Sequence, residues 1–222
     1  MKKNLVPLAG IAALLLFAFV IAAVWYERGE TKLRVDRDKQ VAKQFQADAS
    51  LFVRPHSRSF GRADAKVTVV EFLDPECEAC RAMYPLVKEL LATYDGRIRV
   101  VIRYMPLHPN SSYAVRALEA AGEQGRFEQM LEILFLNQPE WASHHAPKPE
   151  LIPGYAEKIG LDMDAFRKSV GSGTHQAVLD ADLADGRALG VSRTPTFFVN
   201  GRLLPSLGYE AIQQLVEEEL AK

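Results

Sequence analysis

The sequence is 222 residues long, 48% of its residues are hydrophobic, and its formal net charge is −1. This length suits one domain of ordinary size with additional segments. A nucleic-acid surface needs a clustered excess of Lys and Arg, so the charge balance argues against nucleic acid as a partner. The chain has two cysteines, both in Cys77-Glu78-Ala79-Cys80, so no framework of disulfides stabilises the fold.

The N-terminal segment 5–26 is apolar, carries no charge and follows Lys2 and Lys3. A helix of about 20 apolar residues crosses the roughly 30 Å of hydrocarbon in a bilayer. Trp25 and Tyr26 end the segment with aromatic rings that suit a membrane interface. We therefore expect a single-pass anchor in the inner (cytoplasmic) membrane, with the remaining chain on the periplasmic side. A cleavable signal peptide is the alternative.

Residues 27–55 are rich in charge and poor in glycine. Val41 and Phe45 have the spacing of one helix face, but few other apolar residues accompany them. This composition predicts a solvated helical stalk that links the anchor to a folded domain. Self-association through the stalk is a second interpretation of the same segment.

The domain predicted at 56–222 begins with a strand, a helix and a second strand. Residues 66–72 are β-branched and apolar, as in a buried strand. A helical period follows and places Cys80 on its apolar face. Residues 97–105 predict the second strand, and this order favours a parallel pair joined by a crossover helix.

A helical insertion is expected at about 110–189, where amphipathic patterns alternate with glycine and proline. Ser111 or Ser112 is the candidate cap of its first helix, and the proline-rich stretch 139–153 predicts a loop. The elements expected after the insertion are a strand at 196–199, a hairpin turn at Asn200-Gly201, a returning strand at 202–204 and a helix at 209–220. The sequence thus predicts an α/β fold in the order βαβ, helical insertion, ββα.

Cys77 falls at or just before the start of the first predicted helix, and Cys80 lies one turn inside it. Unpaired backbone N–H groups and the positive end of the helix dipole stabilise an anion at a helix start. Because the thiolate is the reactive form, we expect Cys77 to be the more exposed nucleophile, with a lowered pKa. We expect the buried Cys80 to resolve the mixed disulfide, since sulfurs at this spacing form a reducible bond.

Metal binding is the competing interpretation of the two cysteines. Tetrahedral zinc needs about two further nitrogen or sulfur ligands, and none of the five histidines has a spacing that suits a Cys-x-x-Cys partner. No cluster of Met or His, as a copper carrier would need, accompanies the cysteines. We therefore expect no metal and no other cofactor.

Two motifs together resemble a known family. The segment VVEFLDPECxxC at 69–80 resembles the strand and active-site segment of DsbA-like members of the thioredoxin superfamily. The segment RTPTFFVNG at 193–201 resembles their second signature, in which the proline is cis and faces the disulfide. The resemblance covers roughly Arg62 to the C-terminus and includes the helical insertion, which plain thioredoxins lack. Pro85 matches the proline that kinks the active-site helix.

The resemblance implies roles for five residues. Cys77 attacks a partner's disulfide or accepts the attack of a partner's thiolate, and Cys80 resolves the mixed disulfide. Pro195 presents the backbone of Thr194 as an edge with which a partner peptide pairs. Glu71 matches a buried acid that helps to move the proton of the resolving thiol, and burial should raise its pKa. A Glu71 that is merely satisfied by a nearby Lys is the alternative.

The sequence departs from the strongest DsbA-type oxidases between its cysteines. Those oxidases resemble Cys-Pro-His-Cys, whereas this chain has Glu78-Ala79. Asp74 and Glu76 add negative charge nearby, and like charges disfavour a thiolate. Since a stabilised thiolate makes a strong oxidant, we predict a less oxidising pair than in those proteins.

The direction of electron flow has two interpretations. The first is a dithiol oxidase that donates its disulfide to exported Cys-containing proteins and is reoxidised by a membrane partner of the DsbB type. The second is a reductase or isomerase kept reduced by a membrane donor of the DsbD type; Thr194 before Pro195 fits it equally well. A redox-inert binding or chaperone module is a third possibility, from a different class of function.

Overall fold

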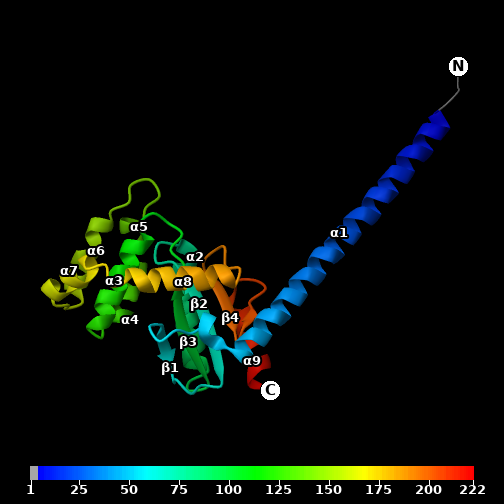
Figure 1. The fold of residues 1–222 in the computed structure, drawn as a ribbon. Coiled ribbons are helices and arrows are strands. Elements are labelled where there is room, and N and C mark those ends of the chain that lie inside the picture. Colours follow the sequence, from blue (N-terminus) through cyan, green and yellow to red (C-terminus); the bar gives the residue numbers. More distant parts are fainter. Residues whose placement is uncertain (1–4) are drawn as a thin grey trace. The chain divides into compact units, whose positions relative to one another are not determined.

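The structure, a computed structural model, describes residues 5–222, with side chains from Ala13 onward. The chain divides into two compact units, Met1–Val41 and Ala42–Lys222. Helix α1 (Leu5–Ala47) forms the described part of the first unit, and its last residues belong to the second (Figure 1).

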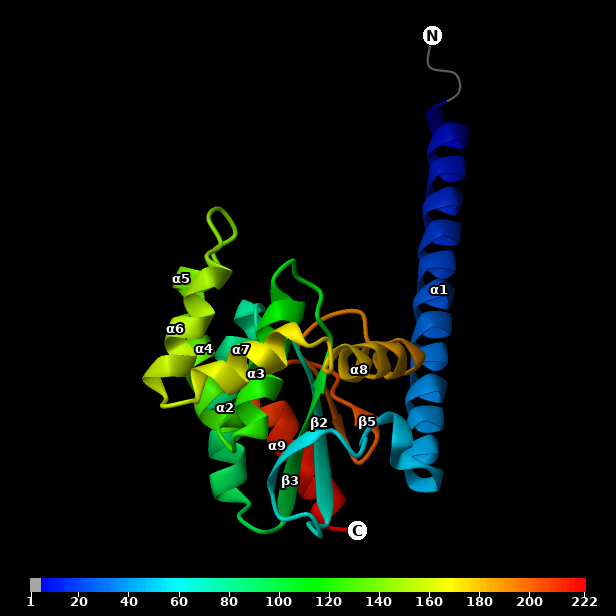
Figure 2. The same ribbon diagram turned by 60° about the vertical axis from the view of Figure 1, so that its left-hand side comes forward.

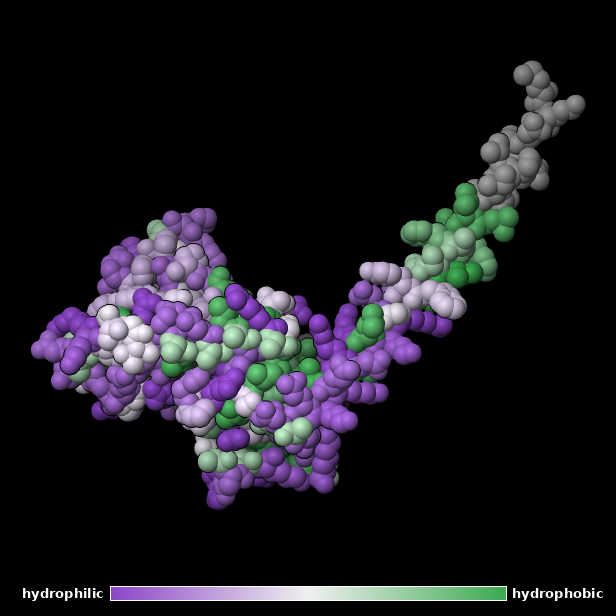
Figure 3. All heavy atoms as spheres, viewed as in Figure 1, coloured by the Kyte–Doolittle hydropathy of each residue, from purple (hydrophilic) through white to green (hydrophobic). Residues whose placement is uncertain are grey.

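In the first unit, α1 exposes large apolar side chains between Leu14 and Val24, visible as a green band in Figure 3. Among the residues searched, which are those that the structure describes, no helix is both long and apolar enough to cross a membrane. The predicted anchor at 5–26 begins before the first described side chain, so part of it lies outside those residues. The predicted transmembrane helix is therefore not confirmed.

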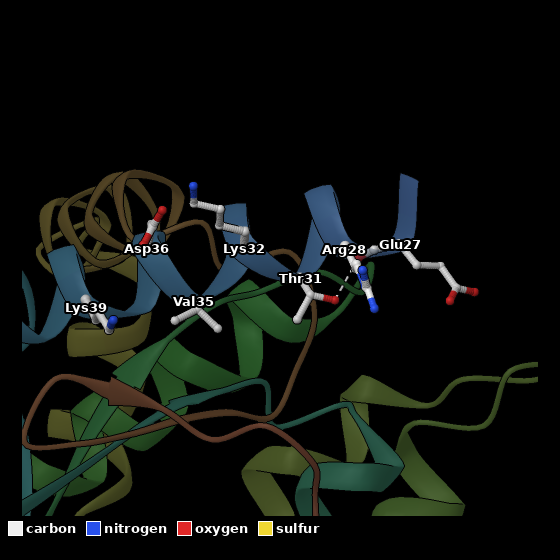
Figure 4. Close-up of a pocket in the computed structure, with 7 residues that line it drawn as sticks. All are labelled: Glu27, Arg28, Thr31, Lys32, Val35, Asp36 and Lys39. Atoms are coloured by element: carbon white, nitrogen blue, oxygen red, sulfur yellow. Dashed lines mark hydrogen bonds between the residues drawn. The ribbon is translucent and has the colours of Figure 1, made fainter. Parts of the chain in front are cut away.

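A surface pocket in the first unit is lined by side chains of α1 alone (Figure 4). The Thr31 hydroxyl donates to the Glu27 carbonyl oxygen at 2.8 Å, within the same helix. The lining residues are all exposed and come from successive turns: Glu27, Arg28, Thr31, Lys32, Val35, Asp36 and Lys39. The pocket is thus a gap between charged side chains of one helix, and no function is drawn from it.

The second unit is built on a five-stranded sheet in the order β1-β3-β2-β4-β5 (Figure 1). β2 and β3 are parallel, as predicted, whereas β1, β4 and β5 each run antiparallel to the neighbour they join. All seven residues of β2 are buried, which explains its continuous apolar run. The strands are β1 (Arg58–Gly61), β2 (Val67–Leu73), β3 (Ile98–Tyr104), β4 (Thr196–Val199) and β5 (Arg202–Leu203).

Helices cover both faces of the sheet. α2 (Glu78–Thr93) and α9 (Tyr209–Leu220) pack on one face, and α8 (Gln176–Ala188) packs on the other. Because side chains alternate along a strand, Glu71 of β2 lies on the α2 face and Phe72 on the α8 face.

The helical insertion joins β3 to β4 and is held together by apolar side chains. In both ribbon views α3 to α7 gather at one side of the sheet (Figures 1 and 2). Trp141 is fully buried there, and its indole N–H donates to the Leu134 carbonyl oxygen at 2.8 Å. Its helices before α8 are α3 (Ser111–Glu123), α4 (Phe127–Leu136), α5 (Gln138–Trp141), α6 (Ile152–Lys158) and α7 (Met163–Gly171).

The predicted order βαβ, helical insertion, ββα is confirmed, but three local expectations are not. The sequence predicts that the domain begins with the strand at 66–72, but the edge strand β1 precedes that strand and pairs antiparallel with β3. The loop predicted at 139–153 contains α5, a 3-10 turn and the start of α6. Ser111 does not cap α3, since Asn110 precedes the helix and the Ser111 hydroxyl donates to Asp74.

The boundary between stalk and domain at 55–56 stays a prediction. The second unit begins at Ala42, because aromatic packing ties residues 42–55 to the sheet. Phe52 is fully buried and contacts the rings of Phe45 and Phe198, with centroids 5.1 and 5.4 Å away. Gly201, at φ +79°, has no room for a Cβ because Phe45 lies against it.

Candidate active site

The turn between β2 and α2 presents both cysteines. Cys77 has extended backbone angles (φ −79°, ψ 123°) and directly precedes the first residue of α2. Its N–H donates to the Asp74 carbonyl oxygen at 3.1 Å, which closes the turn. Cys80 lies one turn inside the helix and is fully buried, whereas Cys77 retains 7% of its exposure. The predicted placement of the pair at the helix start is confirmed.

The cis-proline loop faces the nucleophile. The Thr194–Pro195 peptide bond is cis, as the resemblance implied. The Cys77 thiol donates to the Thr194 carbonyl oxygen, with Sγ and O 3.3 Å apart. The fold therefore brings together two motifs that are separated by more than half of the domain, and Thr194 lies against the reactive sulfur.

The environment separates the acidities of the two sulfurs. The pKa of Cys77 is lowered to about 5, chiefly by a hydrogen bond with the Cys80 thiol. Partial burial opposes this shift, and hydrogen bonds with Thr194 and with the N–H groups of Cys80 and Ala79 add to it. Burial, together with the interactions with Cys77 and Glu71, raises the pKa of Cys80 far above its ordinary value. Cys77 is therefore the thiolate near neutral pH, and Cys80 keeps its proton.

Glu71 lies beneath the pair on β2 and is 2% exposed. Its Oε1 has no hydrogen-bond partner among the described residues, and no Lys satisfies it. Burial, followed by the charge of Cys77, raises its pKa to about 8. A carboxyl with such a pKa exchanges protons close to neutral pH, as expected of a proton carrier.

Asp74 and Glu76, the two other acids of the turn, accept hydrogen bonds from the segment that follows β3. Asp74 is fully buried and Glu76 is 7% exposed. The backbone N–H and the side-chain amide of Asn110 donate to Glu76 at 2.7 and 2.9 Å. Asp74 accepts from the Ser111 hydroxyl, from the N–H groups of Glu76 and Leu107, and from His108. Their charges are thus dispersed over hydrogen bonds, and the expected penalty on the Cys77 thiolate does not outweigh its stabilisation.

Two side chains at the site were not found by sequence reasoning. His108 lies 2.7 Å from Asp74 through its Nδ1. The buried Gln138 of α5 donates from Nε2 to the carbonyl oxygens of Pro75 and Cys77, at 2.9 and 3.0 Å. Both residues come from segments far along the chain, and no periodicity or motif marks them. The parallel register of β2 and β3 brings the loop with His108 to the turn, and the folding of the insertion brings Gln138 there.

The first residue between the cysteines also has a partner in the insertion. Glu78 is half exposed and lies 2.6 Å from His144, through Oε1 and Nε2. Backbone hydrogen bonding, with a contribution from His144, lowers the pKa of Glu78. Because both side chains are open to solvent, this pair is screened and contributes little to stability.

The fold and the paired sulfurs define a class of protein, the thioredoxin-like thiol-disulfide oxidoreductases. The sequence model of the thioredoxin family matches residues 54–218, and the chain therefore belongs to this family. Within that family, the chain carries a helical insertion between β3 and β4, as the resemblance to DsbA-like members implied.

Three solved structures illustrate the similarity. A thioredoxin-like oxidoreductase from Silicibacter pomeroyi DSS-3 is 28% identical, with a TM-score of 0.68 over 78% of this chain and 97% of that one. BdbD from Bacillus subtilis is 23% identical, with a TM-score of 0.67 over 75% and 94%. The thiol-disulfide exchange protein α-DsbA2 from Wolbachia pipientis is 23% identical, with a TM-score of 0.67 over 82% and 97%. The last two share the fold with this chain.

The curated relatives are much longer proteins. A Na(+)/H(+) antiporter NhaA 1 from Salinispora arenicola is 44% identical over 153 residues, which cover 67% of this chain and 22% of the antiporter. The chain therefore spans about a fifth of the length of that relative. Ion transport describes the whole antiporter, and it is not carried over to this chain.

Proposed function

We propose that this oxidoreductase is a dithiol oxidase that donates its Cys77–Cys80 disulfide to exported Cys-containing proteins. A membrane partner of the DsbB type would restore the disulfide. The observation that carries the proposal is the position of Cys77 at the start of α2 beside the cis-proline loop, where hydrogen bonds lower its pKa to about 5. A stabilised thiolate favours the reduced pair, so the disulfide form oxidises other dithiols readily.

The same pKa supports a moderate oxidising strength. The corresponding thiol has a pKa of about 7 in thioredoxin and about 3.5 in DsbA. Cys77, at about 5, falls between them. The sequence-based prediction of a pair less oxidising than the strongest DsbA-type oxidases therefore stands as part of the proposal. Equilibration with glutathione measures it, and a potential as high as theirs would overturn it.

The proposed exchange proceeds in two steps. A substrate thiolate attacks Sγ of Cys77, which forms a mixed disulfide and displaces the sulfur of Cys80. Glu71, which holds a proton near neutral pH, supplies it to the departing Cys80. A second substrate thiolate then attacks the substrate sulfur, so that a substrate disulfide forms and Cys77 leaves as a thiolate. Two electrons pass from the substrate to the pair.

The cis-proline loop is the proposed binding edge for the substrate. Thr194 precedes Pro195, and its carbonyl oxygen lies 3.3 Å from Sγ of Cys77. A peptide that pairs with this backbone would place its own cysteine beside Sγ of Cys77. The pairing would be independent of the peptide's side chains, which suits an enzyme that acts on several substrates.

The redox state of the pair in living cells tests the direction of electron flow. An oxidase is mostly in the disulfide form at steady state, and Cys77→Ser abolishes oxidation of a reduced model substrate. A Cys80→Ser variant should trap mixed disulfides, which identify substrate and membrane partner together. A pair that is found mostly as dithiols would overturn the proposed direction.

A reductase or isomerase kept reduced by a DsbD-type donor is the second candidate. The acidic Glu78 beside Cys77 favours it, since a negative charge there works against the thiolate. Faster reshuffling of a scrambled substrate than oxidation of a reduced one would support this candidate.

We further propose that segment 5–26 anchors the enzyme in the inner membrane, with the catalytic domain on the periplasmic side and the segment after it as a stalk that could self-associate. The charge-free run after Lys2 and Lys3 supports this placement. The anchor predicts that the full chain stays in the membrane fraction after alkaline washing. Recovery of the full-length chain in the wash would contradict it.

A further inference from the structure

A histidine outside both motifs lies beside the active-site turn. His108, in the loop after β3, places Nδ1 2.7 Å from Oδ2 of Asp74. The backbone N–H groups of His108 and Leu107 donate to the same oxygen, at 3.2 and 2.8 Å. The imidazole is thus fixed at one nitrogen, and its tautomer and orientation are set by Asp74.

Asp74 connects this imidazole to both cysteines. Its carbonyl oxygen accepts the N–H of Cys77 at 3.1 Å, and its own N–H points to Sγ of Cys80 at 3.5 Å. The side chain of Asp74 is fully shielded from solvent, whereas that of His108 is 29% exposed. Within this connected group, His108 is therefore the member that can exchange protons with bulk water.

We propose that His108, held by Asp74, is a positioning residue whose protonation tunes the Cys77–Cys80 couple, so that its redox equilibrium follows the pH of the compartment. The imidazolium would supply, from another segment of the chain, the cation that the Glu78-Ala79 dipeptide lacks. The inference rests on Cys77 as the reactive sulfur and holds for either direction of electron flow.

The charges around His108 favour its protonated form. Burial lowers its pKa, but the hydrogen bond and charge of Asp74, together with the charges of Cys77 and Glu76, raise it overall. In return, His108 helps to lower the pKa of Glu78. Carboxylates and the thiolate thus surround the imidazole from the turn and from α2, and formation of the thiolate strengthens its hold on a proton.

The proton balance of reduction shows the direction of the effect. Two glutathione thiols supply two electrons, the Cys77–Cys80 bond breaks, and glutathione disulfide forms. One of the two thiol protons binds Cys80. The other is released to water if His108 stays neutral, or is taken up by His108 beside the Cys77 thiolate. A protonated His108 therefore favours the reduced pair, and this advantage is lost as pH rises through its titration.

The pH dependence of Cys77 alkylation by iodoacetamide, in the reduced full-length protein, tests the proposal. Glu71 interacts with Cys77 and itself titrates near pH 8, so all variants in this alkylation test carry Glu71→Gln. With His108 present, this background should show two steps, one for Cys77 and one for His108. His108→Asn keeps a donor near Asp74 but cannot titrate, so a single step remains. Loss of the cation should shift the equilibrium with glutathione toward the disulfide by about threefold to tenfold at pH 6, and by less at pH 8.

Two further variants separate charge from structure. His108→Lys carries a cation throughout this range, so it should give a single step and keep the wild-type equilibrium at pH 6. His145→Asn removes an exposed loop histidine and should retain both steps. Two steps in His108→Asn, or an equal shift in the Asn and Lys variants at every pH, would overturn the proposal. The alkylation needs no substrate or partner, so this result is independent of the proposed oxidase direction.

Discussion

At the scale of single residues, the active site shifts the pKa values of neighbouring groups in opposite directions. Cys77 is a thiol whose pKa is lowered to about 5, and Glu71 is a carboxyl whose pKa is raised to about 8. The helix start and its hydrogen bonds favour the anion at Cys77, whereas burial disfavours it at Glu71. In the proposed mechanism, Glu71 would therefore still hold a proton at a pH at which Cys77 is a thiolate.

Glu71→Gln should stabilise the reduced protein in a pH-dependent way. The folded-state pKa of Glu71, about 8, lies above the ordinary value of 4.5. Below pH 4, Glu71 is protonated in both the folded and the unfolded state and does not reduce the free energy of unfolding. As pH rises toward 8, the unfolded state loses this proton more readily, and the free energy of unfolding falls by about 4 kcal/mol. Urea unfolding at pH 4 and pH 8 measures this: the variant should gain stability only at pH 8 and exchange disulfides more slowly. An equal gain at both pH values would exclude the raised pKa.

Gln138→Met should weaken the link between the insertion and the active-site turn. Methionine fills a similar volume but leaves the Pro75 carbonyl oxygen without this donor, while Cys77 keeps the N–H of Arg81. We expect a loss of about 1–3 kcal/mol in the free energy of unfolding. Gln176→Met, on the exposed face of α8, is the matched control and should change it by less than about 0.5 kcal/mol. Equal effects of the two variants would exclude a structural role for Gln138.

At the scale of elements, a buried ion cluster joins α8 to β3. Arg103 is fully buried, and its guanidinium lies 2.7 Å from Asp182 and 2.6 Å from Asp185. Arg54 binds Asp185 at 2.7 Å and His56 binds Asp182 at 2.7 Å. The cluster therefore fixes α8, which leads directly into the cis-proline loop, against the sheet and the segment before β1.

Arg103→Met tests this cluster. Removal of one partner leaves buried carboxylates with too few cations, which typically costs about 3–5 kcal/mol. Arg62→Met provides the control, because its pair with Asp64 is largely exposed and is worth less than about 1 kcal/mol. Thermal unfolding of both variants gives the comparison, and similar melting temperatures would show that the cluster contributes little.

At the scale of the whole molecule, the structure sets the minimal folded domain. A chain that begins at Ala42 retains Phe45, Phe52 and Arg54 and should unfold like the full-length protein. A chain that begins at Ser57 lacks Phe52, whose ring packs on Phe198, and its free energy of unfolding should fall by about 3–5 kcal/mol. Phe52→Ala in the full chain checks the same contact without truncation. Equal stability of the two truncated chains would place the boundary at 55–56, as the sequence suggested.

The sequence by itself determined the order βαβ, helical insertion, ββα and the reactive pair. The β-branched, apolar run of β2, the helical period through Cys80 and the Asn200-Gly201 turn are local signals, and local backbone geometry follows from them. The position of Cys77 at a helix start is equally local, so its lowered pKa could be anticipated from the chain alone.

Only the tertiary structure decided which distant groups surround the sulfurs. His108 lies beside the turn because the parallel strands β2 and β3 end at the same edge of the sheet, and Gln138 lies there because the insertion folds back on the turn. Strand β1 pairs with the edge that β3 offers. The charges of Asp74 and Glu76 could not be weighed from sequence, since their effect depends on the donors that bind them. Such contacts depend on packing between segments far apart in the chain, which no local pattern records.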